Sequence, residues 1–523
     1  MRQLHPLSRS VRRASRAWLA LALLIATSGC AVGPDFDRPE PPAVAGYTRK
    51  PLASPAADRT GPQVAPQQFQ IGAGVPARWW AAFRSFPLNE LIRRSVARNP
   101  TLDAADAAIR IANENAQAQR GLFYPQLGAN YTAADQQSSN MARQQGPGDP
   151  PQSRYSLHTA QLTISFVPDL WGQNARSVES LEAQTEQARF QLEAAYLTLT
   201  TNVVTAAIQE ASLRGQIAAT ERIIKIERDI LGILNSQLQA GQAAQVDVLT
   251  QQTALAQVEQ TLPPLQKQIA IQRDLLTALA GQFSADEITE TFDLQHLALP
   301  RNLPISLPAA LVAQRPDIRA AQANLHAASA LVGVAIAARL PNITLSANPG
   351  SSAFKPAELL TPGTLFYTVA GSATATVFDG LTLYHRQKSA EAALDQAGAL
   401  YRQAVITALQ NVADSLRSLQ ADARAVQAAI KAEDSARATL DIIQKQLTLG
   451  QISQVTVLNA QQAYLNTAIA RVQAEATRLA DTAALFMALG GGWPAACTTH
   501  VWRDCIMSEG RVDVLRTADA APK

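Results

Sequence analysis

Two halves of this chain repeat each other, and the duplication is the feature that most constrains its fold. Residues 237–249 read QLQAGQAAQVDVL and residues 446–458 read QLTLGQISQVTVL, with eight of thirteen positions identical at an offset of 209. Upstream, residues 99–127 align with residues 315–343 at an offset of 216. Two units of roughly 200 residues are too few and too large for a solenoid array. The pattern predicts an internal tandem duplication.

Each half contains a stretch long enough for one very long helix. No proline occurs from residue 172 to residue 240, or from residue 380 to residue 449. At a rise of about 1.5 Å per residue, either stretch would form a helix about 100 Å long. Apolar residues in the first stretch recur at intervals of three, four and seven positions, which predicts left-handed coiled-coil packing.

A glycine ends each of these stretches, and a second helix is expected to run back from it. Gly241 and Gly450 are interpreted as helix C-cap glycines, because glycine adopts the left-handed conformation without a steric penalty. The returning helices are predicted at 245–281 and 453–489. Pro263-Pro264 should break or kink the first of them about halfway.

Pairs of strands are predicted in each half, at 126–135 with 159–166 and at 342–348 with 368–378. Their alternation puts apolar residues on one face and small polar residues on the other. This pattern fits strands of a transmembrane barrel, with lipid outside and water inside. A half-buried soluble sheet alternates in the same way, so the strands alone leave both possibilities open.

The N-terminus has the order of a secretory signal peptide: a basic segment, a short apolar stretch, then TSGC ending at Cys30. A small-small-Cys ending indicates lipidation of Cys30, and ordinary cleavage beside an incidental cysteine is the alternative. Loss of residues 1–29 removes five arginines and no acidic residue, so the formal charge changes from +3 to −2. Nucleic-acid binding is therefore not indicated.

No residue pattern indicates catalysis or a metal site. The six histidines show no metal-ligand spacing, and HExxH, P-loop and GxSxG motifs are absent from the sequence. Cys497 and Cys505 lie in the tail, where a disulfide and two free thiols are equally compatible with an exported protein. The sequence is interpreted as that of a protein that is not an enzyme.

Several motifs together resemble the TolC-like outer-membrane efflux channels, in particular the lipoprotein branch that includes the NodT and OprM proteins. The motifs, in chain order, are CAVGPDFDRP (30–39), RWWAAF (78–83), VPDLWG (167–172), LPAALVAQRPDIRAAQANL (307–325) and ALGGGW (488–493). They span nearly the whole chain after the signal peptide. The resemblance is therefore carried by their combination and order.

The resemblance implies a mixed membrane α/β fold. Three protomers would each give four strands to one barrel of 12 strands, continued by a long periplasmic α-helical barrel. Four strands cannot close a barrel, and open strand edges are not tolerated in lipid, which independently favours pooling of strands. The expected domains are a signal peptide (1–29), a lipid-anchored segment (30–86), a first efflux repeat (87–285), a linker (286–306), a second efflux repeat (307–493) and a tail (494–523).

The implied function is that of an outer-membrane channel lipoprotein in a tripartite efflux system, with an RND-type pump expected. The implied partners are two further copies of the chain, a periplasmic membrane-fusion adaptor, an inner-membrane pump and outer-membrane lipid. No cofactor is implied beyond N-palmitoyl and S-diacylglycerol groups on Cys30. The alternative is a lipid-anchored trimeric coiled-coil protein, acting as a structural element or adhesin of the cell envelope.

Two sets of residues are candidates for function if the chain is an efflux channel. The helix turns would dock the adaptor through residues that the repeat makes equivalent and that we expect to be exposed: Gly241, Gln242, Gln245, Gly450, Gln451 and Gln454. Asp441 resembles an aspartate of the family's acidic periplasmic gate. Arg437, four residues earlier, could instead form an ordinary surface ion pair with Asp441.

Overall fold

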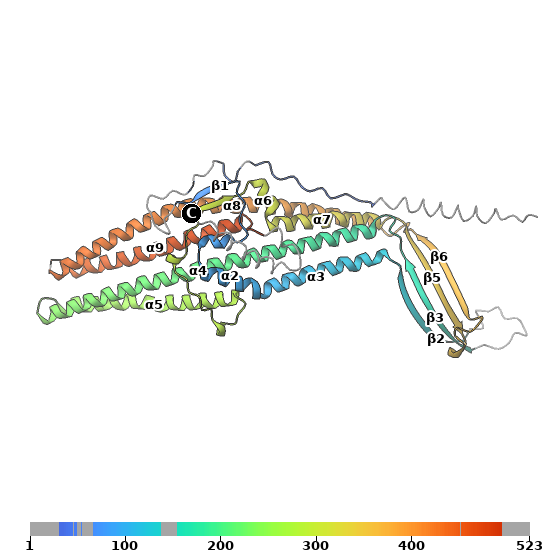
Figure 1. Ribbon diagram of the computed structural model, residues 1–523, viewed down its shortest axis with the longest axis horizontal. Coiled ribbons are helices and arrows are strands. Elements are labelled where there is room, and N and C mark those ends of the chain that lie inside the picture. The colour runs from blue at the N-terminus through green and yellow to red at the C-terminus, as the bar shows by residue number, and fades with distance from the viewer. Residues whose placement is uncertain are drawn as a thin grey trace, which may run out of the picture. The chain divides into compact units, whose positions relative to one another are not determined.

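The computed structural model places most of the chain, and Figure 1 labels its elements. The residues that it describes are 31–44, 46–49, 54, 66–137, 154–449 and 451–493. Four residues named above lie outside this part of the chain: Cys30, Gly450, Cys497 and Cys505.

The described residues form two compact units, and each unit combines segments from both halves of the sequence. The first unit is made from the described parts of Met1–Pro39, Ala108–Ala188 and Ala321–Tyr401. The second is made from the described parts of Glu40–Ala107, Arg189–Ala320 and Arg402–Lys523. The two repeats therefore fold by pairing with each other.

A four-stranded antiparallel sheet lies in the first unit (Figure 1). Its strands, in spatial order, are β2 (Gln126–Gln137), β3 (Arg154–Phe166), β5 (Asn342–Ala353) and β6 (Leu365–Thr374). Three strands are longer than the sequence predicted. The fourth is displaced toward the N-terminus, and it ends where Thr374 pairs with Asn342, because β5 begins there and offers no partner beyond it.

The register of the sheet sorts side chains onto two faces, as the alternation predicted. Paired residues on neighbouring strands point to the same face of the sheet, so the face of a residue on one strand gives the face of its partner on the next. One face carries mainly apolar residues: Leu127, Ala129, Tyr131, Ala160, Leu162, Ile164, Leu345, Ala347, Leu365, Tyr367 and Val369. The other face carries mainly polar residues: Gln126, Asn130, Thr132, Gln161, Thr163, Ser165, Ser346, Asn348, Thr368 and Ser372.

Two helical hairpins follow the strand pairs (Figure 1). The first is α4 (Gln173–Gln239) with α5 (Gln245–Leu279), and the second is α8 (Thr382–Thr448) with α9 (Gln454–Ala488). These bounds confirm the long helices, the breaks and the returning helices expected from the sequence. In the second unit, one core cluster contains residues of all four helices, including Ile223, Val248, Leu440 and Val457.

The predicted break at Pro263-Pro264 is wrong, because α5 is continuous from Gln245 to Leu279; a kink there stays a prediction. Both prolines are exposed. On an exposed face, water can satisfy the carbonyl groups that lose their helical partners. Packing of the opposite face then keeps the helix intact.

The remaining elements are shorter than the four helices of the hairpins. In order they are β1 (Gln68–Ile71), η1 (Trp79–Phe83), α2 (Phe86–Arg98), α3 (Pro100–Arg120), η2 (Gly121–Phe123), η4 (Ser284–Asp286), η5 (Leu294–His296), β4 (Asn302–Ile305), α6 (Pro308–Gln314), α7 (Pro316–Ala337) and η6 (Pro356–Glu358). Strands β1 and β4 pair in parallel. Among the described helices, α7 alone is long and apolar enough to span a membrane by length and composition. Its buried alanines, including Ala323, Ala327 and Ala330, mark a packed face.

Candidate functional site

The turn between α4 and α5 has the geometry of a glycine helix cap. Gly241 has φ +71°, its N–H donates to the carbonyl of Leu238 (3.0 Å), and the N–H of Gln242 donates to the carbonyl of Gln237 (2.8 Å). These two bonds form a Schellman motif. The predicted cap at Gly241 is confirmed. Gln242 and Gln245 are exposed beside it.

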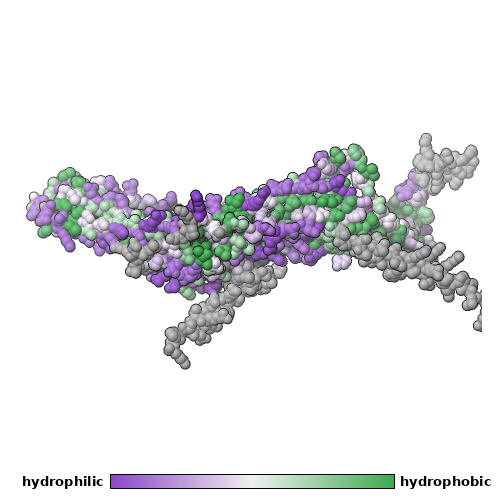
Figure 2. Space-filling model, turned by 90° about the horizontal axis from the view of Figure 1, so that it is seen from above, coloured by the Kyte–Doolittle hydropathy of each residue, from purple (hydrophilic) through white to green (hydrophobic). Residues whose placement is uncertain are grey.

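The second turn repeats this chemistry in part. Gln451 N–H donates to the carbonyl of Gln446 (3.0 Å), which is the equivalent of the bond made by Gln242. Gln451 is exposed. Apolar side chains are exposed near both turns as well, at Val246 (64%) and its repeat equivalent Val455 (63%). Figure 2 shows hydrophobic and hydrophilic surface side by side along the helical part of the molecule.

Gln454 departs from the expectation that it would be exposed like Gln245. Only 7% of its surface is accessible, and its amide N–H donates to Oε1 of Gln251 on α5. The side chain is therefore buried in a contact between helices and is not displayed at the surface. The repeat makes the two glutamines equivalent in sequence, but Gln245 is exposed and Gln454 is buried.

A buried carboxylate completes this connection between the hairpins. Gln251 donates from Nε2 to the side-chain Oε2 of Glu227 on α4 and to the Glu227 carbonyl (3.2 Å). Glu227 is 2% exposed. Burial raises the pKa of Glu227 to about 7, and the hydrogen bond from Gln251 opposes this rise only in part. We call Glu227, Gln251 and Gln454 the glutamine clasp, because they join α4, α5 and α9.

Asp441 is exposed and lines a groove of about 500 Å³ between α4 and α8. Asp229 on the α4 side and Lys445 on the α8 side also line it. Arg437 makes its contacts elsewhere, with Glu433 (3.3 Å) and the hydroxyl of Tyr464 (3.3 Å). The two acidic residues of the groove thus come from equivalent long helices of the two repeats.

The segment just after the predicted lipidation site is docked on the first unit. The backbones of Gly33 and Gly333 approach so closely that a Cβ on Gly33 would lie 2.4 Å from the Gly333 Cα atom. Arg176, on α4, forms an ion pair with Asp35 (2.6 Å). Phe36 stacks on His326, with 4.4 Å between ring centroids. Residues 31–36 are therefore held by an ion pair, an aromatic stack and close backbone packing against α4 and α7.

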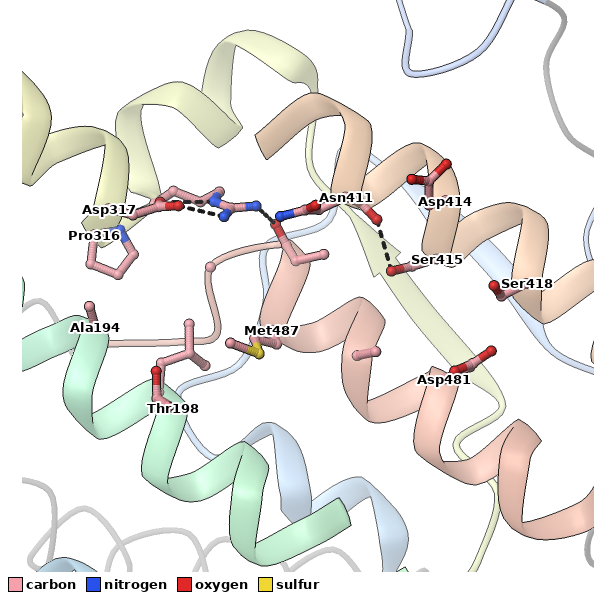
Figure 3. Close-up of a pocket in the computed structure, with 15 residues that line it drawn as sticks. Ala194, Thr198, Pro316, Asp317, Asn411, Asp414, Ser415, Ser418, Asp481 and Met487 are labelled. Carbon is pink, nitrogen blue, oxygen red and sulfur yellow. Dashed lines mark hydrogen bonds and ion pairs between the residues drawn. The ribbon is translucent and has the colours of Figure 1, made fainter. Parts of the chain in front are cut away.

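A cavity of about 410 Å³ with both polar and apolar lining residues lies in the second unit, among α4, α7, α8 and α9 (Figure 3). Arg315 binds Asp317 through both guanidinium arms (2.9 and 2.6 Å) and donates to the carbonyl of Ala488 (2.7 Å). Gly490 has φ +90°, and a Cβ there would lie 3.0 Å from Cγ of Arg315. The RPD and ALGGGW motifs thus form one junction, which the sequence did not reveal.

No group of three or more His, Cys, Asp or Glu side chains in the described part of the chain is arranged to hold a metal ion. The geometry consists instead of a two-faced sheet, long hairpins and polar contacts between helices. It suits a conduit or a scaffold.

Comparison with known proteins decides between these two. The outer membrane efflux protein family matches residues 91–282 and 307–491. The chain belongs to this family. Its members are transport proteins of the outer membrane and not enzymes. The channel interpretation is confirmed, and the structural or adhesin alternative is not supported.

Relatives and solved structures agree with this assignment. The chain is 29% identical to the pyoverdine export outer membrane protein OpmQ of Pseudomonas putida, over 81% of this chain and 90% of that protein. It is 25% identical to nodulation protein T of Rhizobium leguminosarum bv. viciae, over 91% of this chain and 94% of that protein. The outer-membrane channel OprN superposes with a TM-score of 0.78 and 25% identity, covering 89% of this chain and all of OprN. VceC of Vibrio cholerae superposes with a TM-score of 0.73 and 27% sequence identity, covering 80% of this chain and all of VceC. The chain is an efflux channel protein located in the outer membrane.

Proposed function

We propose that three copies of this chain pool their strands into one 12-stranded barrel in the outer membrane. The observation that carries the proposal is the sheet itself, with one apolar face, one polar face and two open edges. The outer edges of β2 and β6 pair with no strand of the described chain. Unpaired backbone groups are costly in lipid, so the edges need strands from other copies.

Exposed tyrosines at and near the apolar face support membrane insertion. Tyr124 lies just before β2 at the helix end, and Tyr131 lies on the apolar face of β2. Seven residues at about 3.3 Å each separate them by about 23 Å along the strand, which is about 16–19 Å of height for a tilt of about 35–45°. Aromatic residues of such barrels gather at the edges of the apolar band. The polar face then lines a watery lumen.

Conductance tests the assembly directly. Full-length protein in a planar bilayer should form channels, and chemical cross-linking should give trimers. In the proposed tunnel the hairpins extend into the periplasm, and Asp441 narrows its mouth. Asp441→Asn should relieve block by multivalent cations added on the periplasmic side, whereas Asp395→Asn, an exposed acid elsewhere on α8, should leave the block unchanged. Equal block in both variants would remove Asp441 from the gate.

The hairpin turns are proposed to dock a periplasmic adaptor coupled to an inner-membrane pump of the RND type. Exposed Gln242, Gln245 and Gln451 supply hydrogen-bonding groups, and Val246 supplies apolar contact area. Gln454 is left out of this surface because it is buried. The double variant with Gln242→Trp and Gln451→Trp should lower efflux while the trimer persists. A tryptophan at exposed Gln266, farther along α5, is the control.

We also propose that Cys30 carries the lipid. The small-small-Cys ending of TSGC supports this, and residues 31–36, which follow it, are held by contacts with α4 and α7. Each buried CH₂ of an acyl chain contributes about 0.8 kcal/mol, so lipid reinforces the anchoring by the barrel. Cys30→Ser should abolish labelling with a palmitate analogue and leave trimers in the membrane. Labelling should be unchanged in Cys497→Ser.

A further inference from the structure

The apolar face of the sheet contains a hollow that conduction does not require. Its volume is about 900 Å³, within the range of about 300–1,000 Å³ of small-molecule sites. Leu360 and two rows of apolar-face residues line it: Ala129, Leu162, Pro349 and Tyr367 in one row, and Tyr131, Ala160, Ser351 and Leu365 in the other. The rows cross all four strands, so the hollow is centred on the sheet of one copy.

An interruption in the sheet underlies the hollow. Pro349 lies in β5, an interior strand, where proline is rare because it cannot donate to the ladder. The register between β3 and β5 skips Leu162 and Thr163 at this level. Gly350 follows, and a Cβ there would lie 2.7 Å from the ring of Phe366. A side chain at position 350 would therefore require its neighbours on β3 and β6 to shift.

A loop residue in an unfavourable conformation forms the rim. Leu360 has φ +67°, in the left-handed region that non-glycine residues rarely adopt, and its side chain is 76% exposed. Its N–H donates to Oγ of Ser351 (3.1 Å), and Ser351 donates to the hydroxyl of Thr364 (2.9 Å). Ser351 is fully buried. The loop thus holds an exposed leucine beside the hollow, which is unfavourable in water and favourable against hydrocarbon.

Polar and charged groups lie on the same face toward the strand ends that lead into the loops. The hydroxyl of Tyr131 is 2.9 Å from Nδ1 of His158. Farther along, Asp135 forms an ion pair with Arg154. Amphipathic aromatic rings and charged side chains of membrane proteins gather at the level of the lipid head groups. The hollow therefore lies on the hydrocarbon side of a head-group level.

We propose that this hollow binds the acyl chain of a membrane lipid, whose head group lies beside His158 and the Arg154–Asp135 pair. The inference rests on the proposed contact of the apolar face with lipid, and it adds a preferred position on that face. The hollow is continuous with the apolar band and has apolar walls and a polar end. These features match a chain that is apolar along its length and polar at one end.

Photo-cross-linking of the full-length protein tests this site. The protein is reconstituted in vesicles of phosphatidylethanolamine and phosphatidylglycerol, with a trace of phospholipid that carries a diazirine on its acyl chain. Mass spectrometry should find cross-links at Leu162, Leu360 and Tyr367 enriched about five-fold over Leu345 and Val369, as expected for a preference of about 1 kcal/mol. The reference residues lie on the same face outside the hollow.

Matched variants distinguish binding of lipid in the hollow from general contact of the apolar face with lipid. Ala160→Trp fills the hollow and should remove the enrichment, whereas Val369→Trp adds the same side chain outside it and should preserve the enrichment over Leu345. Leu360→Gly removes the rim and relieves the positive φ, so it should lower the enrichment even if Ala160→Trp fails to assemble. Cross-links spread evenly over the apolar face would overturn the lipid site and leave the barrel placement standing. A face without any cross-links would overturn the placement as well.

Discussion

Replacing Glu227 with glutamine should stabilise the glutamine clasp at alkaline pH. Glutamine keeps an oxygen that accepts the hydrogen bond from Gln251, but it carries no charge. In the folded protein, burial raises the pKa of Glu227 from 4.5 to about 7. A group with a raised folded pKa binds its proton more tightly in the folded state. Stability is therefore highest below about pH 4.5 and falls as the pH rises toward 7 and above.

The magnitude follows from the size of the shift. A difference of about 2.5 pKa units corresponds to about 3.5 kcal/mol at most, since each unit is worth about 1.4 kcal/mol. The effective dielectric around a buried side chain is higher than that of dry protein, so about 1–2 kcal/mol is the expected effect. The advantage of Glu227→Gln over the wild type should appear between pH 5 and pH 8.

Hydrogen exchange measures this locally, because amide protection reports the free energy of opening of each segment. Amides of α5 near Gln251 and of α9 near Gln454 should exchange about 5–30 times more slowly in Glu227→Gln than in the wild type at pH 8. At pH 5 the difference should be smaller. Glu221→Gln removes an exposed carboxylate from the same helix and is the control. An equal ratio at both pH values would refute the burial argument.

Two further predictions concern glycines. Gly241→Val should destabilise the α4–α5 turn by about 1–2 kcal/mol because of its positive φ, whereas Gly232→Ala, in open space within α4, should stabilise that helix by about 0.5–1 kcal/mol. Hydrogen exchange of the turn checks both. Gly333→Val should release residues 31–36 and speed chymotrypsin cleavage after Phe36, since any side chain would meet the Val32 carbonyl and Arg176. Gly46→Ala, with no atom within 4 Å, should leave the cleavage rate unchanged.

Local patterns in the sequence predicted the helices and turns well, because their causes are local. The absence of proline, the position of Gly241 and the alternation of the strands each act within a few residues. Lengths of strands were less predictable, since β6 ends where its partner β5 begins. The predicted break at Pro263-Pro264 did not occur, because the effect of these prolines depends on which face of α5 is exposed.

Contacts between distant segments could not be predicted from one sequence. Gly33 and Gly333 meet across 300 positions, and the local sequence around either glycine does not indicate the other. Glu227 left a signal that could have been used. It lies four residues after Ile223 and three before Ile230, both buried, so a carboxylate stands on an apolar helix face. Such a residue is a candidate for a buried hydrogen-bonded charge.

The glutamine clasp also makes the two helix turns different as docking surfaces for the proposed adaptor. In sequence, Gln245 and Gln454 are equivalent, and a duplicated chain in a trimer would present six equal turns. In the structure, the first turn exposes Gln245, while the second withdraws Gln454 to bind Gln251. If three copies assemble as we propose, the six turns alternate between two surfaces of different hydrogen-bonding capacity. An adaptor that reads these groups would therefore meet a surface of threefold and not sixfold symmetry, and variants of the two turns should differ in their effect on efflux.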